Sequence, residues 1–248
     1  MKILICISNV PDTTTKIRFV ENNTQFDKKG VQWIINPWDE LALTRAMELK
    51  EKSGKIEKIT VVNVGPKETE GTLRKALAVG ADNAIRVDAD PKDAFFTASQ
   101  LAEVIQKESY DIIMTGIESS DYNGNAVGGM LAEMLDFPSV SSVSKLDIEG
   151  EQVVVQREID GGQEKLETQL PFIAIVQKGI AIEPRIPAMR GIMMARKKPL
   201  EVVEATDVQP LVNYKSYELP EPKAACKMIE PDQMKELVDK LHNEAKVL

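Results

Sequence analysis

The chain alternates between short apolar runs of strand length and longer segments with helical periodicity. The apolar runs lie at residues 2–8, 59–64, 84–87 and 111–115. Between them, apolar residues recur at roughly helical spacing over 41–49, 73–79 and 101–105. Because parallel neighbouring strands need crossover connections, this pattern predicts an α/β fold with a doubly wound, mostly parallel nucleotide-binding sheet and helices on both faces.

Residues typical of helix ends support the predicted helices. Asn36 can cap a helix, Pro37 suits its first position, and Asp39 and Glu40 favour its positive end. Gly80 follows the next helical pattern, where a left-handed cap is expected.

The pattern of apolar and polar residues changes after Pro138. Residues 140–148 and 153–159 alternate around a turn at 149–150, which predicts a β-hairpin extension. From Pro199 onward, five prolines interrupt regular structure and leave one amphipathic helix at 231–245. We therefore expect a nucleotide-binding domain over 1–198 and an extended C-terminal arm over 199–248 that packs on another subunit; a flexible linker is the alternative.

Composition excludes several classes of function. The 248 residues carry a net charge of −8, which argues against nucleic-acid binding. Two cysteines and the single His242 support neither a metal centre nor histidine-based catalysis, so we predict no catalytic residue and no metal ligand. No signal-peptide pattern and no apolar run of about 18 residues occur, which predicts a cytoplasmic protein without membrane insertion.

Nucleotide chemistry is expected beyond the carboxyl ends of the strands, where backbone amides and helix N-termini can face an anion. Three segments fit that place: 8–15, 65–66 and 116–129. The last holds small residues that allow close backbone approach, with a helix start near Asn125. Neither a Gly-x-Gly-x-x-Gly fingerprint nor a P-loop is present, so a plain polar surface loop is the alternative.

Four blocks of sequence resemble the electron-transfer flavoprotein beta family, over nearly the whole chain. They are Val10-Pro11-Asp12 with Lys16-Ile17-Arg18; Asn36-Pro37-Trp38-Asp39-Glu40; Arg74-Lys75-Ala76-Leu77-Ala78-Val79-Gly80; and Arg157-Glu158-Ile159-Asp160-Gly161-Gly162 with Leu170-Pro171, Glu183-Pro184-Arg185 and Gly191-Ile192-Met193.

The resemblance implies an adenine nucleotide alpha-hydrolase-like fold and a heterodimer with a larger alpha subunit. That subunit would hold most of an FAD, while this chain contributes a wall to the flavin site and binds AMP as a structural ligand. Phosphate contacts would come mostly from 123–128. The positions that map onto the AMP site are Cys6, Ile7, Ser8, Asn9, Asn36, Val64, Gly65, Pro66, Met114, Thr115, Gly116, Asn123, Gly124, Asn125, Ala126, Val127 and Gly128.

The same resemblance implies a recognition loop that docks on partner dehydrogenases. It maps to Arg185, Ile186, Pro187, Ala188, Met189, Arg190, Gly191, Ile192 and Met193. Met189 stands at the anchor position, where leucine is usual; its alternative role is a core methionine. Glu158 maps to an acidic residue that pairs with an alpha-subunit arginine; its alternative role is a solvated strand residue.

The implied function is that of an electron carrier rather than an enzyme. It would shuttle electrons from flavin dehydrogenases, such as acyl-CoA dehydrogenases, to a membrane quinone oxidoreductase or another acceptor. A beta subunit of an electron-bifurcating flavoprotein, using NADH and a second FAD, is the alternative within the family, although the loop 121–129 departs from the pattern typical of that group. A non-redox nucleotide-sensing module is the alternative of another class.

Overall fold

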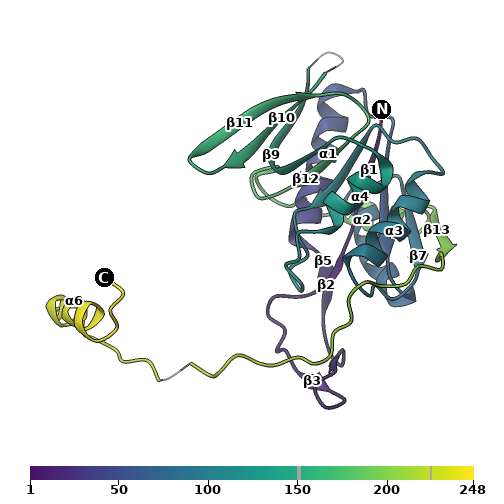
Figure 1. The fold of residues 1–248 in the computed structure, drawn as a ribbon. Coiled ribbons are helices and arrows are strands. Elements are labelled where there is room, and N and C mark those ends of the chain that lie inside the picture. The colour runs from purple at the N-terminus through teal and green to yellow at the C-terminus, as the bar shows by residue number, and fades with distance from the viewer. Residues whose placement is uncertain (150–151, 224) are drawn as a thin grey trace.

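A computed structural model describes residues 1–149, 152–223 and 225–248, and its centre is a nine-stranded sheet flanked by helices (Figure 1). Among these residues, no helix is long and apolar enough to cross a membrane. The strands are β1 Lys2–Cys6, β2 Asn9–Pro11, β3 Phe19–Val20, β4 Gln25–Phe26, β5 Trp33–Ile35, β6 Lys58–Val64, β7 Asn83–Asp88, β8 Ile112–Gly116, β9 Ser139–Glu149, β10 Gln152–Ile159, β11 Gly162–Thr168, β12 Phe172–Val176 and β13 Leu200–Glu204. The helices are α1 Pro37–Ser53, a 3-10 turn Lys67–Thr69, α2 Glu70–Val79, α3 Ala94–Ile105, α4 Val127–Leu135, α5 Met189–Ala195 and α6 Met234–Asn243.

The strand order of the large sheet is β11-β10-β9-β12-β8-β1-β6-β7-β13. From β1 the chain first proceeds outward to β6 and β7, then returns to β8 on the other side of β1, and all these neighbours pair in parallel. The order of the strands therefore reverses between β1 and β8. The predicted doubly wound, mostly parallel sheet is confirmed.

Each face of the sheet carries its own apolar layer. One layer joins α1 and α2 to the sheet through residues such as Leu43, Leu73 and Leu77, all fully buried. The other joins α3 and α4 to the opposite face through Leu101 and Leu131. The helical spacing of the apolar residues in the sequence produces this arrangement, because each helix has one stripe to bury.

The predicted helices are present, but their ends differ in detail from the prediction. Pro37 is the first residue of α1, but the Asn36 side chain makes no capping hydrogen bond and turns instead to a loop described below. Gly80 ends α2 with φ +151° and ψ −10°, outside the left-handed helical region that we expected. The helix predicted near Asn125 begins at Val127.

The expected hairpin is part of a three-stranded antiparallel extension, β9-β10-β11, that continues the main sheet. Its predicted turn at 149–150 reaches beyond the described residues. The third strand, β11, was not foreseen because its exposed, polar residues have no apolar alternation.

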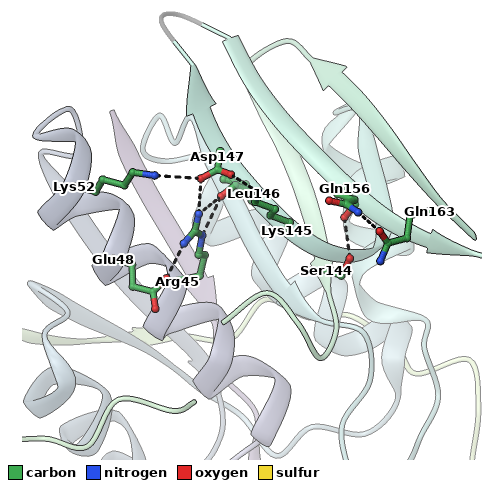
Figure 2. Close-up of polar contacts among 9 residues, drawn as sticks. All are labelled: Arg45, Glu48, Lys52, Ser144, Lys145, Leu146, Asp147, Gln156 and Gln163. Carbon is green, nitrogen blue, oxygen red and sulfur yellow. Dashed lines mark hydrogen bonds and ion pairs between the residues drawn. The ribbon is translucent and has the colours of Figure 1, made fainter. Parts of the chain in front are cut away.

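Arg45 of α1 fastens this extension to the body of the protein (Figure 2). Its Nε and Nη2 donate to the carbonyl of Leu146 at 2.9 and 2.7 Å, and Nη2 also lies 2.7 Å from Asp147 Oδ1. Its Nη1 meets Glu48 of the same helix at 2.7 Å. One arginine, 14% exposed, thus ties the second half of β9 to α1.

The C-terminal arm begins with a strand that the sequence did not predict. β13 pairs in parallel with β7, from Leu200 opposite Ala84 to Glu204 opposite Asp88. Prolines interrupt regular structure only farther along, and the arm then leaves the body and ends in α6, far from the sheet (Figure 1). No described residue of α6 is buried.

Three sets of contacts hold the first part of the arm on the body. The side chain of Gln100 exchanges hydrogen bonds with the backbone of Thr206 at 2.8 and 2.9 Å. Asp93 caps α3 through Phe96 N with one carboxylate oxygen, and with the other accepts from the amides of Leu211 and Val212 at 2.6 and 2.8 Å.

The third set of contacts is a row of four aromatic rings. Tyr122 meets Tyr214 with ring centroids 5.3 Å apart, Tyr214 stacks on Tyr217 at 6.0 Å, and Tyr217 stacks on Phe19 at 5.0 Å. The Tyr217 amide also donates to the Asn23 carbonyl at 2.7 Å. The segment 206–217 is thereby tied to α3, to the loop after β8 and to the β3–β4 hairpin.

Asp93→Ala is expected to loosen the arm. It removes the cap of α3, which typically costs about 0.5–2 kcal/mol, together with both acceptor contacts to the arm. Trypsin should then cut after Lys215, between the two arm tyrosines, faster than in the wild type, as followed by mass spectrometry. Asp90→Ala, at a 71% exposed neighbour, is the matched control and should leave the cutting rate unchanged. Equal rates for all three chains would show that Asp93 does not hold the arm.

Candidate functional site

The structure brings the predicted nucleotide residues to one edge of the sheet. Strands β8, β1 and β6 are neighbours in that order, and the three predicted segments follow their carboxyl ends. Cys6 ends β1 and residues 7–9 follow it, Val64 ends β6 and residues 65–66 follow it, and Met114 to Gly116 end β8. The reversal of strand order between β1 and β8 is where doubly wound sheets bind ligands.

Asp39, in the first turn of α1, ties the ends of β1 and β8 together. Its Oδ2 accepts from the Ser8 amide at 2.7 Å and its Oδ1 from the Gly116 amide at 2.8 Å. The side chain is 2% exposed. Burial raises the pKa of this carboxyl to about 7, while the amides of Ser8 and Gly116 act to lower it.

Asn36 secures the loop after β8 from the same helix terminus. Its Nδ2 donates to the Glu118 carbonyl at 2.8 Å and its Oδ1 accepts from the Ser120 amide at 3.1 Å. Its own amide donates to the Ser8 carbonyl at 3.0 Å. Asn36 is fully buried, so it shapes the loop from beneath.

Glycine is required at three predicted positions because neighbouring atoms come close. A Cβ on Gly116 would collide with the Asp39 carboxylate and lie 2.7 Å from Trp38 Cβ. On Gly65 it would lie 2.5 Å from Asn63 Oδ1, and on Gly128 2.7 Å from Thr115 Oγ1. A Cβ on Gly124, by contrast, would meet no protein atom within 4 Å.

Two buried polar atoms at this edge make no hydrogen bond within the described part of the chain: Asn63 Oδ1 and Thr115 Oγ1. Their residues are 4% and 3% exposed and stand at the ends of β6 and β8. Buried polar atoms normally have partners, so orphans at a strand terminus indicate a place where a ligand or a water molecule bonds.

The loop that would hold a phosphate is open and preshaped. Residues 121–125 are exposed, and both Asn123 and Asn125 take positive φ angles of 51° and 42°. Ala126 precedes α4, whose first amides face the loop end of the helix without a side-chain cap. Free N-terminal amides favour a bound anion.

The described residues form neither a reactive thiol nor a metal centre at this edge. Burial first, and then the nearby Asp39 carboxylate, raise the pKa of the Cys6 thiol, so it is no activated nucleophile. Within 1–149, 152–223 and 225–248, no group of three metal-ligating side chains is assembled.

The predicted recognition stretch is apolar and exposed. Ile186 is 88% exposed, Met189 75% and Met193 69%, so Met189 is not a core methionine. Its first residue is fixed to α1, because the Arg185 amide donates to Thr44 Oγ1 at 2.9 Å and Arg185 Nη1 pairs with Glu51 at 2.7 Å. The stretch is a loop only in part, since α5 begins at Met189.

Gly191 determines how closely α5 approaches α2. A Cβ at this position would come within 2.5 Å of the Ala78 carbonyl oxygen. Any side chain at residue 191 would therefore push the helix that carries Met189 and Met193 outward.

Glu158 lies on β10, in the antiparallel extension and away from the recognition stretch. It is half-buried, and Gln163 of β11 donates to its Oε1 at 2.7 Å. Gln163 also accepts from Gln156, so a short polar chain crosses this face of the extension (Figure 2). The side chain is therefore oriented, rather than freely solvated.

The sequence did not identify Asp39 or Asn63 as parts of this edge. Asp39 was assigned to the electrostatics of a helix N-terminus, which any acidic residue there would serve. Its contacts are with Ser8 and Gly116, far away in sequence. Only the pairing of β1 beside β8 brings these amides together.

Comparison with known proteins gives a consistent result. The family model for the "Electron transfer flavoprotein domain" matches residues 23–208. The chain is 37% identical to the electron transfer flavoprotein subunit beta of Bacillus subtilis, with both chains covered in full. It is 36% identical to the protein of the same name from Syntrophomonas wolfei, over 94% of this chain and 91% of the relative, and 35% identical to the human one, over 84% and 83%.

Replacing Asp39 by Asn should change how stability depends on pH. In the folded chain the carboxyl keeps its proton up to about pH 7, whereas in the unfolded chain it loses it near pH 4. Between these values the folded state binds more protons, so the free energy of unfolding falls as the pH rises. The stability of the wild type relative to Asp39→Asn should therefore decline between about pH 4 and pH 7, by at most about 1.4 kcal/mol per unit.

Urea unfolding at a series of pH values measures this difference. Asp90→Asn, on an exposed side chain, is the control and should keep the pH profile of the wild type. A constant difference between the wild type and Asp39→Asn would mean that Asp39 is charged throughout.

Proposed function

The chain belongs to the beta-subunit family of electron transfer flavoproteins, and on that premise we propose that it binds AMP and, with an alpha subunit, forms a heterodimer whose FAD carries electrons between partner proteins. Membership of a flavoprotein family implies association with flavin, and the name shared by the relatives implies a second subunit. The electrons would come from flavin dehydrogenases, such as acyl-CoA dehydrogenases, and pass to a membrane quinone oxidoreductase or another acceptor.

The edge formed by β8, β1 and β6 carries the AMP proposal. Three glycines there leave room for no side chain, and Asn63 Oδ1 and Thr115 Oγ1 are buried without partners among the described residues. The free amides of α4 supply a place for a phosphate next to the open loop 121–125. The residues present thus fit an adenine mononucleotide that spans from β6 to α4.

Two exposed surfaces support a partner-dependent protein. Met189, Ile186 and Met193 form an apolar surface beside α1 and α2, which fits docking on a dehydrogenase. The arm leaves the body with Leu211, Leu219 and Met228 more than half exposed, which fits packing on the alpha subunit. In this proposal Glu158, which accepts a hydrogen bond from Gln163, pairs with a cation of that subunit.

In this proposal the chain's own residues bind and orient, and none forms or breaks a covalent bond. FAD, when bound, supplies the redox chemistry. Asp39 and Asn36 fix the loops that would receive AMP, and Arg45 ties the extension that carries Glu158 to α1.

Co-purification with the alpha subunit tests the proposal. We expect one FAD and one AMP per heterodimer after denaturation and chromatography, and little flavin on this chain produced alone, because the nucleotide site described above takes a mononucleotide. Two FAD molecules per complex, together with oxidation of NADH, would instead establish electron bifurcation. Tightly bound yellow flavin on the isolated chain would contradict the assignment of the main flavin site to alpha.

Gly124→Ala distinguishes crowding of the ligand from strain in the protein, when the AMP content of the heterodimer is measured as above. An added methyl at 124 meets no protein atom, so any loss of AMP would come from the ligand. Gly162→Ala, equally unobstructed but on β11 of the antiparallel extension, is the matched control and should retain AMP.

Met189→Ala should slow electron delivery without disturbing the fold. Truncating a central anchor of an interface commonly costs about 2 kcal/mol, so reduction of the flavin by a dehydrogenase should slow roughly thirtyfold where affinity limits the rate. Dithionite reduction should be unchanged. Normal transfer together with a lower melting temperature would make Met189 a packing residue.

A further inference from the structure

Arg86 is a buried cation directly behind the turn that closes β6. Its side chain is 4% exposed, although arginines are rarely buried unless paired. It lies near the end of β7, two residues before Asp88, and no feature of the sequence pattern marks it.

The guanidinium holds the turn by its backbone. Nη1 donates to the Gly65 carbonyl at 2.9 Å and to Asp88 Oδ1 at 2.5 Å, while Nε lies 3.3 Å from Glu70 Oε1. The Gly65 amide donates to the Val87 carbonyl at 3.0 Å. Both polar groups of Gly65 are thus bound to β7, and its place is not set by its own strand alone.

Asn63 completes the support from the neighbouring strand. It stands opposite Arg86 in the parallel pairing of β6 with β7, and its Nδ2 donates to the Ile7 carbonyl at 2.8 Å. Asn63 Oδ1 and Arg86 Nε are both buried without a hydrogen-bond partner in the described chain. The two side chains therefore link the ends of β1, β6 and β7 under one turn and retain unused bonding capacity there.

The turn stands on the side of the site away from the phosphate loop. Two strand spacings, roughly 10 Å, separate β6 from β8, because β1 lies between them. A mononucleotide with its phosphate at the start of α4 would therefore place its nucleoside half against Val64–Pro66.

We propose that Arg86 is a positioning residue of the nucleotide site, which by holding the Gly65 carbonyl keeps the turn 64–66 in the shape that receives the nucleoside. The proposal rests on the AMP site proposed above and adds a residue outside it. The competing role is purely structural: an ion pair that joins β7 to Glu70 at the start of α2.

Titration calorimetry on the co-expressed heterodimer, stripped of nucleotide, separates the two roles. The probes are AMP and adenosine, and the variants are Arg86→Met and Arg86→Lys. We expect Arg86→Met to weaken both probes by about tenfold, since the nucleoside is common to both. Arg86→Lys should recover part of the affinity, because its ammonium nitrogen can still donate to the Gly65 carbonyl although it lacks the planar fork of a guanidinium.

Arg74→Met is the matched control. Arg74 also donates to the backbone, to the carbonyls of Ala195 and Lys198 at 2.8 and 2.7 Å, but on the side of α2 that faces α5. It should lower the melting temperature and leave both affinities unchanged.

Each outcome is decisive. If Arg86→Met binds both probes as the wild type does while its melting temperature falls, Arg86 is only structural and the proposal is wrong. A loss for AMP alone would overturn the assignment of the turn to the nucleoside. Should Arg86→Met fail to fold, Arg86→Lys decides by the same comparison. If the wild type binds neither probe and releases no AMP, the nucleotide function itself fails, and the role of Arg86 with it.

Discussion

One buried carboxylate sets the geometry on which the rest of this edge depends. Asp39 spans the point where the order of strands reverses, and bonds one backbone amide from each side, Ser8 and Gly116. In a parallel sheet those strand ends would otherwise present unpaired donors to one another. With them fixed, Asn36 can hold the loop after β8, and Gly116 can pass close enough to α1 that no side chain fits. The positions of the two loops that follow β1 and β8 thus depend on a single side chain in the first turn of a helix.

The body is well packed, whereas the segments added to the sheet leave apolar surface uncovered. Two apolar layers pack the helices α1 to α4 against the sheet. In contrast, no described residue of α6 is buried, and Ile186 and Met189 are mostly exposed. The attachments of these segments are specific: Arg45 for the extension, Arg185 for the recognition stretch and Asp93 for the arm. Apolar groups held outward by polar anchors are characteristic of surfaces that are completed by another chain, because a free chain would gain by burying them.

Elements whose burial imposes a regular spacing of apolar residues are predictable from the sequence. Features that depend on contacts between residues distant in the sequence are not. The apolar runs located β1, β6, β7 and β8 and the helices between them, since each must hide one stripe or both faces. β11 has exposed polar residues, and β13 gains its place only by pairing with β7, so neither has a local signal. The same holds at the site. Strand ends are predictable from the fold class, but the roles of Asp39, Asn63 and Arg86 depend on backbone groups brought close by the strand order.

The loop after β8 is held from two sides. Asn36 bonds Glu118 and Ser120 from beneath, while the ring of Tyr122 packs against Tyr214 of the arm. A loop that is already ordered loses less conformational entropy when an anion binds to its amides, so affinity rises without a new contact to the ligand. Because Tyr214 also stacks on Tyr217 and the arm is tied to Asp93, the order of the loop and the path of the arm are physically joined. A ligand that fixes the loop and a partner that fixes the arm should therefore favour one another, since each reduces the freedom that the other must remove.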